Sequence, residues 1–208
     1  SNNIGIGQGA LCTNVTGIKN IAIGTEALRY NTGSNNTAIG YVALDANTTA
    51  SNNTAVGESA SGKNTTGAQN TTVGAGSFAC NTTGSNNTAI GQAALESNTT
   101  GGSNTAVGRK TFENVTTGSA NVAIGICAGS DASMINITTE SNRFVAGHND
   151  ITNAYVKVDW TVTSDLRDKT EIGDVPVGLQ FVNKLKPVSF RFKKSRENLE
   201  PHGFKKYG

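Results

Sequence analysis

The chain has 208 residues, enough for one or two domains, but only 36% are apolar and 6% aromatic, so a large compact core of the usual kind is not expected. The net charge of +2 is too small to argue for a nucleic acid or an anionic membrane as partner. No apolar run approaches the roughly 20 residues of a membrane helix, which argues against membrane insertion. Half of the charged residues lie in residues 164–208, so the neutral and charged parts are expected to have different roles.

A repeat of 17 residues occupies the first part of the chain. Its marker is a glycine that follows Ile or Val, spaced by 17 residues with one step of 16: Gly7, Gly24, Gly40, Gly57, Gly74, Gly91, Gly108 and Gly125. A fixed period of this length predicts a solenoid, in which each unit buries its apolar side chains against its neighbours. Because the sequence opens inside a repeat, we expect the chain to be a fragment of a longer protein.

The positions within one unit have distinct residue types. Asn stands four residues before the glycine in every copy, a β-branched apolar residue one before it, and usually Leu or Phe four after it. The alternating Asn-Thr-Ala-Ile-Gly piece indicates a short strand, and the Asn-Thr-Thr-Gly-Ser-Asn piece indicates a turn. We therefore predict about eight coils of a parallel β-solenoid, with an Ile/Val ladder, a Leu/Phe ladder and hydrogen-bonded Asn side chains. At a strand spacing of about 4.8 Å the segment would be roughly 40 Å long.

Two large apolar side chains per coil make a thin core for a single chain, so we expect several chains to pack side by side, most simply as a homotrimer. The Asn-Thr-Ala-Ile/Val-Gly copies resemble the head repeats of trimeric autotransporter adhesins and similar arrays in phage tail fibres. This resemblance covers residues 1–129 and implies a parallel β-roll that trimerises.

Residues 130–163 break the period and are predicted to form a short β stem. Two strand-like stretches lie in it, Phe144 to Ala146 and Tyr155 to Val162. The second alternates polar and apolar residues, as expected of a strand with one buried face.

Residues 164–208 differ again in composition. Val177 to Leu185 has helical spacing, Pro187 ends that helix, and residues 188–193 alternate as a strand. The segments SDLRDK, GLQFVNKLKPVSFRFK and KKYG resemble, in this order, the start of the C-terminal intramolecular chaperone domain of phage tail spikes and tail fibres. This family, the endosialidase type, assembles a trimer and then cuts itself off. Its α+β domain extends beyond KKYG, so residues 164–208 would be its N-terminal part.

The resemblance implies a self-cleaving serine peptidase that acts once on its own chain. Ser164 would be the nucleophile, Lys169 the general base, and the Thr163–Ser164 bond the cleavage site. A serine hydroxyl needs a base, and a lysine serves as one only when its pKa is depressed. From the residues alone, a serine followed by charges is usually just the cap of a helix, and Ser164 with Asp165 could cap the next segment.

Other candidate sites are weak. GESASGKN (57–64) has the glycine and lysine spacing of a phosphate-binding loop, but Asn64 replaces the required Ser or Thr. The three cysteines have neither disulfide nor zinc spacing and are predicted to be small buried thiols. Neither histidine has a partner at metal-ligand spacing. No cofactor and no metal are therefore expected.

These observations favour a structural and host-adhesion component of a phage tail fibre, located in the virion. Its partners would be its own copies and a host surface glycan or receptor, which residues such as Tyr30, Tyr41, Arg109 and Lys110 on the outer turns would meet. The alternative is a trimeric adhesin on a bacterial cell surface that has the same roll and no proteolytic activity.

Overall fold

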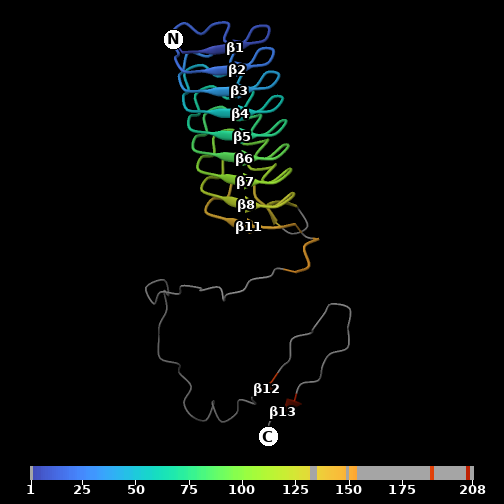
Figure 1. Ribbon diagram of the computed structural model, residues 1–208. Coiled ribbons are helices and arrows are strands. Elements are labelled where there is room, and N and C mark those ends of the chain that lie inside the picture. The colour runs from blue at the N-terminus through green and yellow to red at the C-terminus, as the bar shows by residue number, and fades with distance from the viewer. Residues whose placement is uncertain (1, 132–134, 149, 154–187, 190–204, 207–208) are drawn as a thin grey trace, which may run out of the picture. The chain divides into compact units, whose positions relative to one another are not determined.

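A computed structural model of the chain (Figure 1) describes residues 2–131, 135–148, 150–153, 188–189 and 205–206. Its contacts divide the chain into two units, Ser1–Tyr155 and Val156–Gly208. In the second unit the described residues form a short antiparallel pair, β12 (Val188–Ser189) with β13 (Lys205–Lys206). β12 begins the strand predicted over residues 188–193. The predicted strand at Tyr155 to Val162 and the predicted helix at Val177 to Leu185 lie outside the described residues.

The first unit is a parallel β-solenoid, as the repeat predicted. Each coil adds one short strand to a sheet in which neighbours pair in register and in chain order, and Figure 1 shows these strands stacked as rungs. The nine strands are β1 (Ile4–Ile6), β2 (Ile21–Ile23), β3 (Thr37–Ile39), β4 (Thr54–Val56), β5 (Thr71–Val73), β6 (Thr88–Ile90), β7 (Thr105–Val107), β8 (Val122–Ile124) and β11 (Phe144–Ala146).

Each strand has one inward and two outward positions, because side chains alternate along a strand. The middle residue points inward, and in most strands it is a fully buried alanine such as Ala38 or Ala89. The Ile or Val before the glycine points outward, and Ile90 is 39% exposed. The in-register pairing confirms the Ile/Val ladder. The expectation that this ladder contributes to the core of one chain is wrong, since alanine takes that place.

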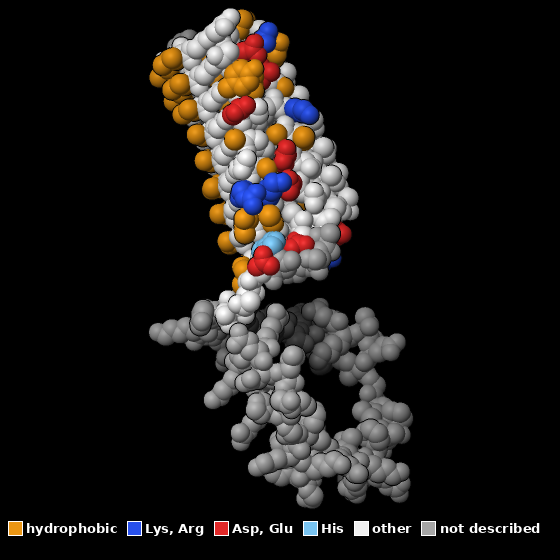
Figure 2. Space-filling model, turned by 90° about the vertical axis from the view of Figure 1, so that its right-hand side faces the viewer, with side chains coloured by type: hydrophobic (Ala, Val, Ile, Leu, Met, Phe, Trp, Pro, Cys, Tyr) orange, Lys and Arg blue, Asp and Glu red, His pale blue; other side chains and the backbone are white. Residues whose placement is uncertain are grey.

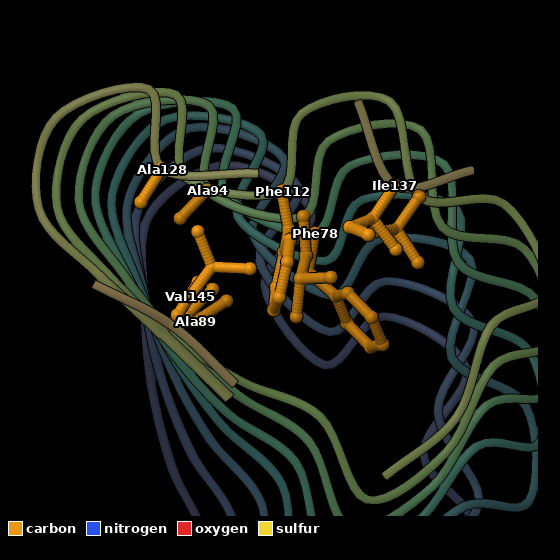
Figure 3. Packing of buried hydrophobic residues seen from close by; sticks show 11 residues of the cluster. Phe78, Ala89, Ala94, Phe112, Ala128, Ile137 and Val145 are labelled. Carbon is orange, nitrogen blue, oxygen red and sulfur yellow. The ribbon is translucent and has the colours of Figure 1, made fainter. Parts of the chain in front are cut away.

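The core is filled by the residue four places after the glycine. Leu28, Leu44, Phe78, Leu95 and Phe112 are fully buried there, which confirms the Leu/Phe ladder. Figure 3 shows Phe78 and Phe112 pointing into the interior, toward Val145 and the alanines of the opposite wall.

Polar residues divide this core into two apolar clusters, one spanning Ala22 to Ala60 and the other Phe78 to Val145. Ser61 replaces the large apolar residue and Thr72 the alanine, and their hydroxyl oxygens lie 3.1 Å apart.

Two ladders of buried asparagines connect the coils. In the predicted ladder, each side chain accepts a hydrogen bond from the backbone N–H of the next Asn and donates one to a carbonyl of the next coil. Asn53 Oδ1 accepts from Asn70 N at 2.9 Å, and Asn53 Nδ2 donates to Gly67 O at 2.9 Å. A second ladder, which the sequence analysis missed, stacks the asparagines seven residues after the glycine, with Asn64 Nδ2 donating to Asn47 Oδ1 at 3.0 Å. These amides satisfy polar groups that would otherwise be costly to bury.

The repeat glycine is required by the distance between coils. Gly74 has a φ of 131°, and a Cβ there would lie 2.6 Å from the backbone C and O atoms of Gly91 in the next coil. Atoms at that distance overlap, so a side chain at this position would push two coils apart. This explains why one column of the repeat is invariant.

The last coil is longer than the others. Arg143 N donates to Asn121 Oδ1 across 22 residues, whereas the preceding ladder bond spans 17. The extra residues carry an antiparallel pair, β9 (Ser130–Asp131) with β10 (Ile135–Asn136). His148 Nε2 lies 3.2 Å from Asp131 Oδ2 and links this pair to the end of β11. The sheet therefore extends beyond residue 129, into the segment expected to be a stem, and β11 confirms the strand predicted at Phe144 to Ala146.

Candidate functional surfaces

The predicted processing residues lie outside the described part of the chain. Thr163, Ser164 and Lys169 fall in residues 154–187, which the structure does not describe. Their assignment as cleavage site, nucleophile and general base therefore stays a prediction. The described residues provide two candidate surfaces on the solenoid instead.

The first surface is the sheet face, which we define as the outward side chains of β1 to β8 and β11. Its two columns hold Ile, Val, Thr, one Phe and one Ala, without any charged residue. The exposed fraction is 38% for Ile39, 39% for Ile90 and 52% for Ile124. A continuous apolar column of this kind marks an interaction surface more often than scattered exposed residues do.

The second surface is the charged flank, formed by the six residues that follow each strand glycine from Gly24 to Gly108. Nine of the ten charged residues among residues 1–130 lie on it. Figure 2 faces this flank and shows acidic and basic side chains over it, with a column of hydrophobic side chains along the left edge, where the sheet lies. The remaining turns of these coils are rich in Asn, Thr, Ser and Gly. They hold the tenth charged residue of residues 1–130, Lys19.

Several of these charges are paired within one coil. Arg29 Nη1 lies 2.8 Å from Glu26 Oε1, and its guanidinium carbon is 5.0 Å from the centre of the Tyr30 ring. Lys110 Nζ lies 2.7 Å from Glu113 Oε1. The Glu26 carboxylate raises the pKa of Arg29, and the hydrogen bond to Glu113 raises that of Lys110. Both cations thus stay charged and held against their partners.

Asp45 differs from the other acids of the flank. Burial raises the pKa of its carboxyl, the Glu26 carboxylate raises it further, and the Arg29 guanidinium opposes both. Among the described residues, its Oδ1 is buried without a hydrogen-bond partner.

The flank is hollowed midway along the solenoid. The larger hollow has a volume of about 380 Å³ and is lined by Glu58, Ser59, Ala75, Gly76, Gln92, Ala93, Glu96 and Lys110. A second hollow of about 240 Å³ adjoins it through Ser59 and includes Asp45 and Lys63. Of the four outer-turn residues predicted to meet a host glycan, Lys110 lines the larger hollow.

The cysteines are not buried as predicted. Cys12 is exposed, and Cys80 and Cys127 are half-buried free thiols. They occupy outward positions of the flank columns, which the 17-residue period alone does not identify as outward. Within the described ranges, no group of three His, Cys, Asp or Glu side chains is placed to hold a metal ion.

In the described residues there is no helix with the length and apolar character needed to cross a membrane. The comparison with curated proteins found no match. The comparison with protein families found one for the C-terminal segment: residues 164–207, which include Ser164 and Lys169, match the Peptidase S74 family, described as "Chaperone of endosialidase".

Proposed function

We propose that the chain is part of a homotrimeric phage tail fibre in the virion, with the solenoid as its shaft and residues 164–208 as the start of the chaperone that assembles it. The observation that carries this proposal is the family match over residues 164–207. The sheet face supports it independently, because it is an apolar column without charge on a chain whose own core is thin.

Self-association would bury apolar side chains of the sheet face that are exposed to water in a single chain. In six of the eight repeat coils the Ile or Val before the glycine keeps a third or more of its surface in water, for example in Ile39, Val73 and Ile90. In the other two, Val56 and Val107 are half-buried. Burying apolar surface gains about 25 cal/mol per Å², and the gain repeats in every coil. A second copy presents an identical column at the same spacing, so matching ladders can pack along their whole length. We propose three copies because the chaperone family that residues 164–208 resemble assembles trimers.

Paired double variants test the shaft interface. Ile39→Asp with Ile90→Asp places two charges on the sheet face, whereas Tyr41→Asp with Gln92→Asp places the same charges two residues later on the flank. We expect the wild-type chain and the flank variant to sediment as trimers and the sheet-face variant as a monomer with unchanged circular dichroism. A wild type that sediments as a monomer, or a sheet-face variant that stays trimeric, would contradict the proposed interface.

We also propose that the chaperone is released by cleavage at the Thr163–Ser164 bond. Lys169, when neutral, would take the proton of the Ser164 hydroxyl, whose Oγ then adds to the carbonyl carbon of Thr163. The amide bond breaks as an ester to Oγ forms, and the nitrogen takes up a proton to become the free amino group of Ser164. Water then hydrolyses the ester, which leaves a carboxylate on Thr163 and restores the hydroxyl.

Intact mass spectrometry tests this step on the protein expressed with its complete C-terminus. We expect the wild type to yield two fragments divided between residues 163 and 164, and both Ser164→Ala and Lys169→Ala to stay whole. If the folded wild type stays whole, the peptidase role is wrong, and Ser164 is left with the helix-cap role. The shaft proposal would survive that result, because the sedimentation experiment tests it separately.

A further inference from the structure

The larger hollow of the charged flank lies over small residues of one coil, between longer side chains of the two neighbouring coils. Ala75 and Gly76 of that coil line it, and in the column of Gly76 the neighbouring Ser59 and Ala93 are small as well. The coil before it presents Glu58, and the coil after it presents Gln92 and Glu96. The floor is therefore made of methyl groups and backbone, and the walls are made of polar side chains. Space remains above the floor, since a Cβ added at Gly76 would meet no atom within 4 Å.

The walls offer more free acceptors than free donors. In the described part of the chain, the carboxylates of Glu58 and Glu96 make no ion pair or hydrogen bond, whereas the Lys110 ammonium is already bound to Glu113 at 2.7 Å. The Gln92 amide can both donate and accept. A ligand that fits must donate hydrogen bonds to two carboxylates and present an apolar surface to the floor. Acidic ligands are disfavoured, because the unpaired charges of the hollow are negative.

We propose that this hollow is a binding site for a saccharide without acidic groups. Adjacent hydroxyls of a sugar ring donate in pairs to a carboxylate, and such charge-assisted bonds are the stronger kind. The C–H face of the ring would lie on the methyl groups of Ala75 and Ala93. The volume of about 380 Å³ falls within the usual range of small-ligand sites, about 300–1,000 Å³. This inference rests on the proposed host-adhesion function and identifies its site and ligand class.

The position of the hollow suits a receptor site on an assembled shaft. It lies on the flank and not on the sheet face, so packing of the sheet faces leaves its lining residues out of the interface. The second hollow, with Asp45 and Lys63, continues it toward the N-terminal coils through Ser59. A chain of several sugar units could extend along the shaft in that direction.

Filling the floor tests the site. Gly76→Val adds a side chain over the floor, and the backbone tolerates it because Val42 has a φ of 49° in the same column of another coil. Gly9→Val is the matched control: it makes the same change in that column of the first coil, away from the hollow, where the new Cβ contacts only Glu26 at an ordinary 3.5 Å or more. Both variants are expected to stay folded and associated like the wild type.

Binding is measured on an array of bacterial surface polysaccharides and then by calorimetry with the best neutral or amino-bearing oligosaccharide. We expect at least tenfold weaker binding for Gly76→Val and wild-type binding for Gly9→Val. For Glu58→Gln and for Glu96→Gln we expect about five- to tenfold weaker binding, because a neutral hydrogen bond replaces a charge-assisted one. Binding to no non-acidic glycan, preference for acidic glycans, or equal binding by Gly76→Val would each overturn the site. Such a result would leave the cleavage and sedimentation results unaffected.

Discussion

The sheet face and the charged flank belong to the same coils but follow different rules. On the sheet face the residue before the glycine is Ile or Val in all eight repeat copies, from β1 to β8. On the flank the residue after the glycine changes from coil to coil: Tyr41, Glu58, Ala75, Gln92 and Arg109 succeed one another. A column keeps one residue type where its side chains stack as a ladder from coil to coil. It changes residue type where each side chain points into solvent separately.

This difference indicates that the flank, and not the sheet face, is where the chain can carry residues specific for a ligand. The uniform columns build the shaft, because their asparagines hydrogen-bond from coil to coil and their apolar side chains pack from coil to coil. The variable columns give each level of the flank its own chemistry without disturbing the stack. A hollow such as the one over Ala75 and Gly76 arises where the small Ala75 lies between the longer Glu58 and Gln92 of the neighbouring coils. The residues of the next column are all small in these three coils: Ser59, Gly76 and Ala93. The comparison can be tested by making the same kind of change at stacked and at outward positions.

The largest effect is expected from a methyl group placed between two coils. Gly74→Ala puts a Cβ 2.6 Å from the backbone of Gly91, so the coils must separate or the strand must shift. We expect the free energy of unfolding to fall by about 3 kcal/mol or more, from overpacking together with backbone strain. Urea unfolding followed by circular dichroism measures it.

The control for this change lies two residues away, on the flank. Gly76→Ala also places a side chain at positive φ, but its Cβ meets nothing within 4 Å, and Ala93 holds the same column at a φ of 56°. We expect a loss of only about 1–2 kcal/mol, the usual cost of the left-handed conformation for an alanine, because no clash is added to it. Equal losses for the two variants would show that φ, and not the distance between coils, selects glycine at position 74.

In the coils that the structure describes, the second asparagine ladder contains both an amide that is hydrogen-bonded to its neighbours in the ladder, Asn64, and one that is not, Asn98. Asn64 Nδ2 donates to Asn47 Oδ1 at 3.0 Å, and Asn64 Oδ1 accepts from Asn81 Nδ2 at 2.7 Å. Asn98 is equally buried, but the next coil has Val115 in this column, and among the described residues its amide has no partner. Asn64→Ala is expected to cost about 2–4 kcal/mol, because it leaves buried neighbours unpaired.

For Asn98→Ala we expect a loss smaller by at least about 1 kcal/mol, since no hydrogen bond is broken. Unfolding of both variants in urea under one set of conditions gives the difference directly. Losses of equal size would indicate that packing of the amide, and not the ladder of hydrogen bonds, stabilises this column.

The sequence predicted the fold because its period is nearly uninterrupted. Eight glycines at steps of 17 residues, with one step of 16, are enough to predict a parallel solenoid, its Leu/Phe core and one Asn ladder. The direction of the Ile/Val ladder was not predicted, since both large apolar positions have the same hydrophobicity and only the strand geometry assigns Ala38 to the inside. The left-handed backbone of the large core residues was also hidden. Leu28, Leu44 and Phe78 have φ of about 50°, which residue type does not suggest.

The candidate sites were predicted less completely. Ser164 and Lys169 were found through family resemblance, and the match over residues 164–207 supports that family without testing either residue. The hollow of the flank was missed, because it depends on which residues of three successive coils become neighbours. A usable signal was present in the sequence: Ala75, Gly76 and Ala79 are all small in columns where other coils carry long side chains. Comparing coils column by column reveals it.

A smaller effect, with opposite signs at two positions, is expected in the core column three residues after the glycine. Alanine fills it in most coils, but Ser77 and Thr111 carry hydroxyls there. Thr111 Oγ1 donates to Gly125 O, whereas within the described residues the buried Ser77 Oγ has no partner. Ser77→Ala should stabilise the chain by about 1 kcal/mol and Thr111→Ala should destabilise it by a similar amount. Thermal unfolding of both variants measures the signs, and a destabilised Ser77→Ala would mean that this hydroxyl is hydrogen-bonded in solution.

The smallest expected effect is a pH dependence from Asp45 on the flank. Burial, reinforced by Glu26, raises the pKa of this carboxyl in the folded chain. Its ionised form therefore disfavours folding, and the stability of the chain gains from Asp45 as the pH falls through the raised pKa toward the ordinary value of about 3.9. The same contribution is lost as the pH rises through the raised pKa.

Asp45→Asn removes this titration and keeps the shape of the side chain. At pH 7 the variant should be more stable than the wild type, by less than about 1 kcal/mol because solvent screens a partly exposed group. At pH 3.5 the two should be equal, since Asp45 is then largely protonated in both the folded and the unfolded chain. Urea unfolding at the two pH values measures how the difference in unfolding free energy between the variant and the wild type changes with pH. A wild type that is more stable than Asp45→Asn at pH 7 would mean that attraction to Arg29 outweighs burial. Charges on the flank would then contribute to the stability of the stack as well as to its surface chemistry.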